Sequence, residues 1–131
     1  MAPAAAAVIA VALAVGLAAC GGSGGPAQPS PTCTPNGTSL SIVAQNQSFN
    51  RSCLAAPANE RFTIALVNQD SGVPHNISIY KTSTAGTALF KGPIFVGPAT
   101  QRMTVHALPP GTYYFQCDVH PDTMNGTLVV R

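Results

Sequence analysis

The chain has 131 residues, of which 8% are charged, and its formal net charge is +2 at pH 7. This length fits one domain of roughly 100 residues with a single hydrophobic core, plus an appendage. Because the few Lys and Arg residues form no basic run interleaved with aromatic side chains, the composition excludes a nucleic-acid-binding surface.

The first segment of the sequence predicts export. Residues 1–19, MAPAAAAVIAVALAVGLAA, are apolar and uncharged, as in a secretory signal peptide. The run LAAC that ends at Cys20 resembles the lipobox of bacterial lipoproteins. That resemblance implies cleavage before Cys20, lipidation of its thiol and attachment to a membrane of the bacterial cell envelope, outside the cytoplasm. Because no Lys or Arg precedes the apolar run, a start further upstream and an uncleaved anchor are alternatives. A plain secretory signal with a coincidental cysteine is a further alternative.

The next segment is predicted to be a tether. After Cys20, residues 21–32 are almost all Gly, Ser, Pro, Ala and Gln, which bury too little apolar surface to fold. Such a segment has a reach on the order of 20–30 Å. The predicted boundaries are therefore a signal peptide at 1–19, a lipobox cysteine and tether at 20–32, and a folded domain at 33–131.

From Ser39 onward the sequence predicts strands and no long helix. Apolar residues recur with period two in short runs, such as FTIALV (62–67), NISIY (76–80) and the segment around Met103 and Val105. Turn signals such as NQDSG (68–72) and LPPG (108–111) separate these runs, and only the stretch 82–90 is ambiguous between a short helix and a loop. The prediction is an all-β Greek-key sandwich or barrel of about seven to eight strands.

The four cysteines need separate explanations in an exported chain, where thiols are usually paired. Cys20 belongs to the lipobox. Cys33 and Cys53 lack a metal-like spacing, and a disulfide between them would stabilise the fold by about 3 kcal/mol. Cys117 is then left as a metal-bound thiolate or as an inert buried thiol. The cysteine count alone also leaves open a pairing of Cys117 with Cys33 or Cys53.

A metal site is suggested by the segment CDVHPDTM (117–124), which contains a thiol, an imidazole and a thioether. Cys117 should end an inward-facing strand, with His120 and Met124 in the following turn. His75 lies far upstream, between a turn and a strand. If both loops lie at one end of the sandwich, the four side chains converge in the pattern of a mononuclear copper site for electron transfer. Taken singly, Met124 would be a core side chain and each histidine a surface residue.

The segments VPHNISIY (73–80) and GTYYFQCDVHPDTMNGTLVV (111–130) resemble the blue, type 1 copper proteins of the cupredoxin family, of the plastocyanin and amicyanin type. The resemblance covers roughly residues 38–131 and implies a cupredoxin fold that binds one copper in the +1 and +2 states. It also implies that Asn76 ties the two ligand loops together by hydrogen bonding. The metal ligands that it implies are His75, Cys117, His120 and Met124.

The ligand loop departs slightly from the family. The spacing between His120 and Met124 is one residue shorter than in plastocyanin-like members and one residue longer than in amicyanin-like ones. This departure leaves the axial distance and the redox potential open.

The resemblance also implies a function, namely a small exported electron carrier whose redox partners dock transiently near His120. With no H-x-H pair and no nucleophile beside a base, the sequence predicts no enzyme. The main alternative is a periplasmic or surface copper protein for storage, sensing or delivery. Such proteins generally use Met-rich or His-rich sites, whereas this chain has three Met. A metal-free adhesion or accessory domain is a further alternative, and the electron donor, acceptor and oligomeric state are not predicted.

Overall fold

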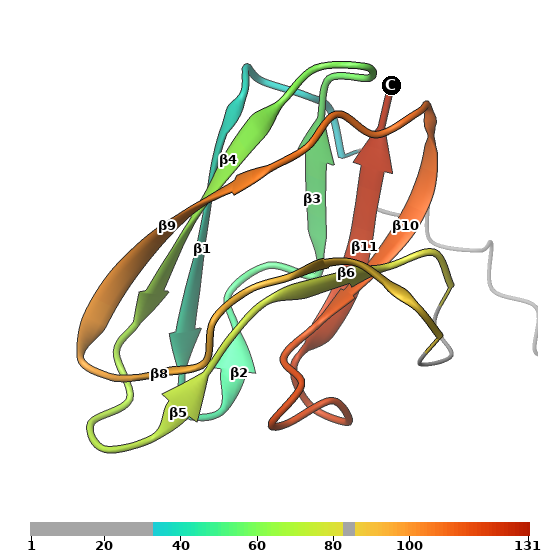
Figure 1. Cartoon of the computed structure of the whole chain (residues 1–131). Coiled ribbons are helices and arrows are strands. Elements are labelled where there is room, and N and C mark those ends of the chain that lie inside the picture. Colours follow the sequence, from blue (N-terminus) through green and yellow to red (C-terminus); the bar gives the residue numbers. More distant parts are fainter. Residues whose placement is uncertain (1–32, 83–85) are drawn as a thin grey trace, which may run out of the picture.

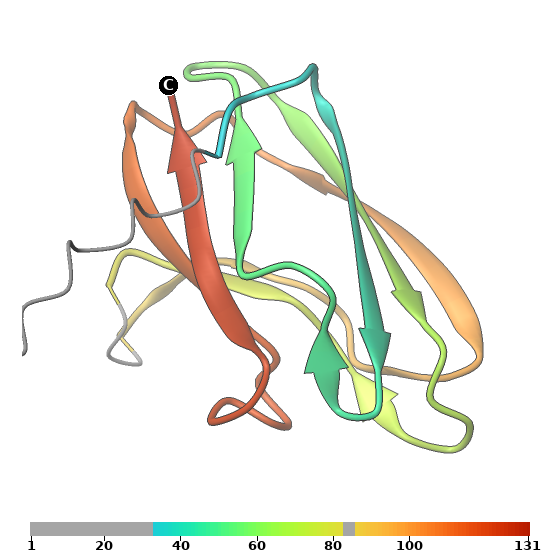
Figure 2. The ribbon, with the colours of Figure 1, turned by 180° about the vertical axis from the view of Figure 1, so that it is seen from behind.

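The computed structural model describes residues 33–82 and 86–131, so the predicted signal peptide, Cys20 and tether lie outside the described residues. Two β-sheets face each other, and Figures 1 and 2 show the two layers from opposite sides. The all-β sandwich predicted from the sequence is therefore confirmed. The described residues contain no helix, and hence none that is long and apolar enough to span a membrane.

The first sheet has four strands, in the order β2 (Ser48–Phe49), β1 (Ser39–Gln45), β4 (Phe62–Asn68) and β9 (Ala99–Val105). Strands β1 and β4 run parallel, with Leu40 opposite Ile64. Strands β4 and β9 run antiparallel over their full length, and Ile64 is also opposite Met103. The long β4 is thus the central strand that holds this sheet together.

The second sheet has five strands, in the order β3 (Cys53–Ala56), β11 (Asn125–Val130), β10 (Gly111–Gln116), β6 (Ser78–Tyr80) and β7 (Ala88–Lys91). The β10–β11 hairpin is its longest ladder and runs from Gly111 opposite Val130 to Gln116 opposite Asn125. A separate two-stranded ladder joins β5 (Pro74–His75) to β8 (Phe95–Val96). The ambiguous stretch 82–90 contains the start of β7, and residues 83–85 lie outside the description.

The core lies between the two sheets and follows the alternation in the sequence. In β4, Phe62, Ile64 and Leu66 are each at most 1% exposed. Removing a side chain of this size from water stabilises the fold by ~1.5–3 kcal/mol. From the second sheet, the fully buried apolar side chains include Ile79, Phe115, Leu128 and Val130. Both sheets therefore supply one apolar face to a single core.

The segments that were predicted to carry the metal ligands lie together at one end of the sandwich. Strands β5 and β8, the β1–β2 turn and the loop between β10 and β11 all lie at the end opposite the C-terminus (Figures 1 and 2). Loops fixed at the end of a packed sandwich can hold side chains in precise positions. This end is therefore where the candidate site is built.

Candidate metal centre

His75 is held by the small β5–β8 ladder at this end of the molecule. It lies opposite Phe95 in that ladder, and its side chain is fully buried. The next residue, Asn76, is also fully buried. A histidine that follows a turn would normally be exposed, so its burial indicates that the imidazole has partners inside the protein.

The second segment is the loop that follows β10. Cys117 comes directly after the strand, is fully buried, and is the free cysteine among the described residues. The loop then closes on itself, because the Cys117 N–H donates to the Met124 carbonyl (2.8 Å) and the Met124 N–H donates to the His120 carbonyl (3.0 Å). The backbone therefore fixes Cys117, His120 and Met124 relative to one another.

The structure brings His75, Cys117 and His120 together. Sγ of Cys117 lies 3.8 Å from Nδ1 of His75 and 4.0 Å from Nδ1 of His120, and the candidate ligand atoms all lie within 4.8 Å of one another. Nitrogen and sulfur ligands of one ion, at metal distances of about 2.0 and 2.3 Å and an angle of about 120°, would be about 3.7 Å apart. The three donor atoms therefore have the spacing of a shared metal ion.

Met124 is the remaining ligand candidate. Its side chain is fully buried in the same apolar cluster as Cys117. Burial in that cluster agrees equally with a core side chain and with a thioether that faces a metal. Its role as the axial ligand stays a prediction.

A buried polar network joins the two ligand segments. The Asp118 N–H donates to Oδ1 of Asn76 (2.8 Å), and Nδ2 of Asn76 donates to Oδ2 of Asp118 (2.9 Å) and to the Gly92 carbonyl (3.0 Å). Asn76 therefore links the residue after His75 to the residue after Cys117. The resemblance implied such hydrogen bonding for Asn76, and its role beside a bound metal stays a prediction.

Comparison with known proteins identifies the family. The family model described as a cupredoxin-like domain matches residues 6–130. This chain belongs to that family. No curated protein sequence matches this cupredoxin.

Solved structures share its fold. Auracyanin from Roseiflexus castenholzii has a TM-score of 0.65 at 20% identity, covering 75% of this chain and 99% of that one. Auracyanin A from Chloroflexus aurantiacus, described as a "blue" copper protein, has a TM-score of 0.64 at 21% identity, covering 73% of this chain and 100% of that one. Amicyanin from Paracoccus versutus has a TM-score of 0.54 at 20% identity, covering 71% and 81%.

The donor set of this cupredoxin fits one type 1 copper. A thiolate and two imidazoles in a trigonal arrangement are the ligands of such a site, because soft sulfur favours Cu(I) and imidazole accepts both oxidation states. His75, Cys117 and His120 supply this set from two loops of a rigid sandwich. The copper predicted from the sequence is therefore supported by the geometry as well as by the family.

Sequence reasoning missed the surroundings of Asp118. The carboxylate accepts hydrogen bonds from the side chains of Ser78 (2.6 Å), Tyr80 (2.7 Å), Asn76 (2.9 Å) and Gln116 (3.1 Å). Burial raises the pKa of Asp118, but these hydrogen bonds outweigh it and lower the pKa to about 2. The spacing of positions 76, 78 and 80 on one face of a strand is the signal that could have revealed this network.

Sequence reasoning also missed Asp70. Its Oδ2 lies 2.7 Å from Nε2 of His75, on the side of the ring opposite Nδ1. The backbone N–H of Gln47 and the ring of His75 hold the pKa of Asp70 below its usual range. Asp70 lies in the segment NQDSG, which the sequence analysis identified only as a turn between two strands. No pattern in the sequence pairs this carboxylate with His75.

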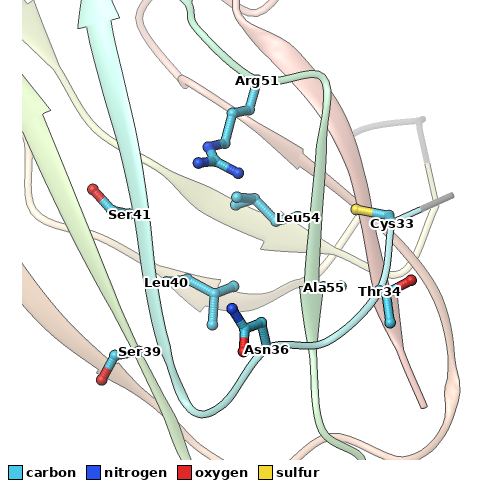
Figure 3. Close-up of a pocket in the computed structure, with 9 residues that line it drawn as sticks. All are labelled: Cys33, Thr34, Asn36, Ser39, Leu40, Ser41, Arg51, Leu54 and Ala55. Carbon is cyan, nitrogen blue, oxygen red and sulfur yellow. The ribbon is translucent and has the colours of Figure 1, made fainter. Parts of the chain in front are cut away.

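The two other described cysteines form a disulfide. Cys33 and Cys53 are bonded, with Cα atoms 6.0 Å apart, so this pairing is the one that the structure contains. A hollow lies beside the disulfide between the first described residues, β1 and β3 (Figure 3). It is lined by Cys33, Thr34, Asn36, Ser39, Leu40, Ser41, Arg51, Leu54 and Ala55. None of the candidate metal ligands lines it, so the hollow is separate from the metal centre.

Proposed function

We propose that this cupredoxin is a small electron carrier that holds one copper ion on His75, Cys117, His120 and Met124. The observation that carries the proposal is the cluster of two imidazoles and one thiol within 4.8 Å, in a chain of a family whose members are mostly electron carriers. Bound there, copper supplies a one-electron couple between Cu(I) and Cu(II). Amicyanin, one of the structural neighbours, has been solved in a Cu(I) form.

The protein's own contribution is to hold the ligands still. His75 and Cys117 are fully buried, and each is attached to a strand or directly follows one. The hydrogen bonds between Asn76 and Asp118 fix the two segments against each other. Because this frame does not depend on the metal, the ligand positions change little when an electron arrives or leaves. Fast exchange of electrons with a partner requires this rigidity.

Partners would dock where His120 reaches the surface. His120 is partly exposed, whereas His75 is completely buried, so His120 offers the shorter route to a partner. Val119 and Pro121 beside it are exposed, and Val96, which is 55% exposed, pairs with Pro74 next to the other histidine. A small apolar surface suits the brief and weak docking of redox proteins.

The same proposal places the protein outside the cytoplasm, attached to a bacterial membrane through a lipid on Cys20. The LAAC sequence supports the attachment, although Cys20 lies outside the described residues. The Cys33–Cys53 disulfide supports export independently, because disulfides persist in oxidising compartments and are rare in the cytoplasm. Labelling of the expressed protein with a radioactive fatty acid, compared between the native chain and Cys20→Ser, would test the anchor.

A visible absorption spectrum tests the copper site. Addition of Cu(II) to the purified protein should produce an intense blue charge-transfer band, because the thiolate of Cys117 donates charge to Cu(II). The band should bleach with ascorbate and return on oxidation. Cys117→Ser is the matched control, since it replaces one sulfur by oxygen in a buried position and should give no such band.

Two results would contradict the electron-carrier proposal. A weak band that survives in Cys117→Ser would mean that the thiol is not a ligand. A blue band without reversible redox chemistry, together with rapid loss of copper to a chelator, would instead support a protein that stores or delivers the metal.

A further inference from the structure

The two nitrogens of the His75 ring have different surroundings. Nδ1 faces Sγ of Cys117 at 3.8 Å, and Nε2 lies 2.7 Å from Oδ2 of Asp70. The His75 side chain is 0% exposed and that of Asp70 is 10% exposed, so the contact is largely shielded from water. An ionised carboxylate only accepts hydrogen bonds, and therefore the ring must place its proton on Nε2 to make this one.

Asp70 is itself held by the backbone around it. Its carboxylate accepts the N–H groups of Asn46 and Gln47, the two residues of the β1–β2 turn. Its own N–H donates to Oδ1 of Asn68 (3.0 Å), whose Nδ2 donates to the carbonyls of Val73 (2.9 Å) and Phe95 (3.1 Å). The carboxylate is thus fixed between a tight turn and the ring, and it cannot rotate away without losing several hydrogen bonds.

We propose that Asp70 is a positioning residue for the metal centre. It keeps His75 in the tautomer with the proton on Nε2, so that the Nδ1 lone pair faces Cys117 before a metal binds. The carboxylate also makes the imidazole more basic and places a fixed negative charge behind it, and both effects favour Cu(II) over Cu(I). The inference rests on the copper site of the proposed function but does not require an electron-transfer partner.

The two histidines of the site therefore play different parts. Among residues 33–82 and 86–131, Nε2 of His75 has a carboxylate partner, whereas His120 contacts Sγ of Cys117 through its Nδ1, at 4.0 Å. His75 is the anchored ligand, and His120 is the ligand at the surface. A carboxylate behind a metal-binding histidine is worth 10- to 100-fold in metal affinity in other proteins.

The test replaces Asp70 by asparagine. Asparagine keeps the shape of the side chain, but it loses the negative charge and replaces one acceptor oxygen by an NH₂ donor. Its remaining oxygen is a weaker acceptor for the Nε2–H, and where the NH₂ group faces the ring it favours the opposite tautomer, with the proton on Nδ1. Nitrogen-15 NMR of the full metal-free chain should show a proton on Nε2 of His75 in the native protein and a change in Asp70→Asn. Copper affinity, measured by competition with a chelator, should fall by about tenfold or more, and the reduction potential should rise.

Two control variants separate a specific effect of Asp70 on His75 from a general loss of negative charge and from a loss of stability in the β1–β2 turn. Asp122→Asn removes the same charge at an exposed position two residues from His120, and should leave the tautomer and the affinity unchanged. Asn46→Ala strains the β1–β2 turn, because φ of Asn46 is 53°, but keeps the backbone N–H and the Asp70–His75 contact. It should lower stability without a change in tautomer.

Two outcomes would overturn the inference. One is a native protein with the proton on Nδ1 of His75, a result that counts even if Asp70→Asn does not fold. The other is an Asp70→Asn protein that is less stable but has unchanged affinity and potential, because Asp70 would then serve only the turn. The tautomer is read without metal, so a failure of the copper proposal cannot be mistaken for a failure of this one.

Discussion

At the scale of single residues, Met124 shows how one buried side chain can serve packing, chemistry or both. It is 0% exposed, and its backbone closes the loop that carries Cys117 and His120. If the thioether is the axial ligand, it is a weak donor to copper, and its loss would remove electron density that stabilises Cu(II) more than Cu(I). A side chain used only for packing would have no such effect.

Met124→Leu separates these possibilities. Leucine has a similar volume, so the free energy of unfolding should fall by less than about 1.5 kcal/mol. The blue band should remain, since the thiolate is unchanged, and the reduction potential measured by voltammetry should rise. Met103→Leu is the matched control, because Met103 is buried in β9 of the other sheet. Equal potentials in the two variants would show that Met124 is a core side chain only.

Residue types revealed the candidate ligands but not the residues that hold them in place by hydrogen bonding. His75, Cys117 and His120 are rare side chains in suggestive positions, so the sequence alone could single them out. Asp70 and Asp118 could be interpreted only as turn or surface residues. Their partners come from several separate segments, and hydrogen bonds of this kind depend on how the sheets pair and pack. Local patterns do not contain that information.

At the scale of elements, the β10–β11 ladder couples the site loop to the core. Gly126 lies opposite Phe115, two residues after Met124. A Cβ atom on Gly126 would collide with the Phe115 ring and would lie 2.5 Å from the carbonyl oxygen of Ser52. This glycine is therefore required by a close approach of three segments.

Gly126→Ala should destabilise the protein by ~1–3 kcal/mol, because the Phe115 ring and the β3 segment must both move to admit one methyl group. Chemical denaturation would measure the change. Gly111→Ala lies in the same ladder, where the new Cβ would meet the Tyr113 ring at an ordinary distance of 3.5 Å, and should change stability by no more than about 0.5 kcal/mol. Equal losses in both variants would contradict the collision.

The strands themselves were predictable where they are long. Period-two alternation located β4, β10 and the end of β9. Residues 33–82 and 86–131 form eleven strands where about seven to eight were expected, because β2, β5 and β8 have only two residues each. Two residues are too few to show a period. The alternation of apolar residues also could not predict that β1 pairs in parallel with β4 and β3 with β11, because alternation does not specify a partner strand.

At the scale of the whole molecule, stability and chemistry reside in different parts of one fold. The candidate metal centre is built by the β5 segment and the β10–β11 loop, whereas the disulfide ties the first described residues to β3. Cys53 lies opposite Thr127 of β11, so the disulfide reinforces the second sheet without touching a candidate ligand. The two cross-linked residues are separated by 20 positions.

Removal of the disulfide should therefore lower stability and spare the site. In the double variant Cys33→Ala with Cys53→Ala, the unfolded chain gains the freedom of the opened loop, which corresponds to about 3 kcal/mol. Denaturant unfolding should show this loss, and the blue band should keep its position and intensity at low denaturant. The variant Cys33→Ala alone is the control for a newly exposed thiol, because Cys53 is then free to compete for copper. If the double variant folds but loses the band, the disulfide and not the sandwich alone holds the ligand loops, and the separation of the two functions would be wrong.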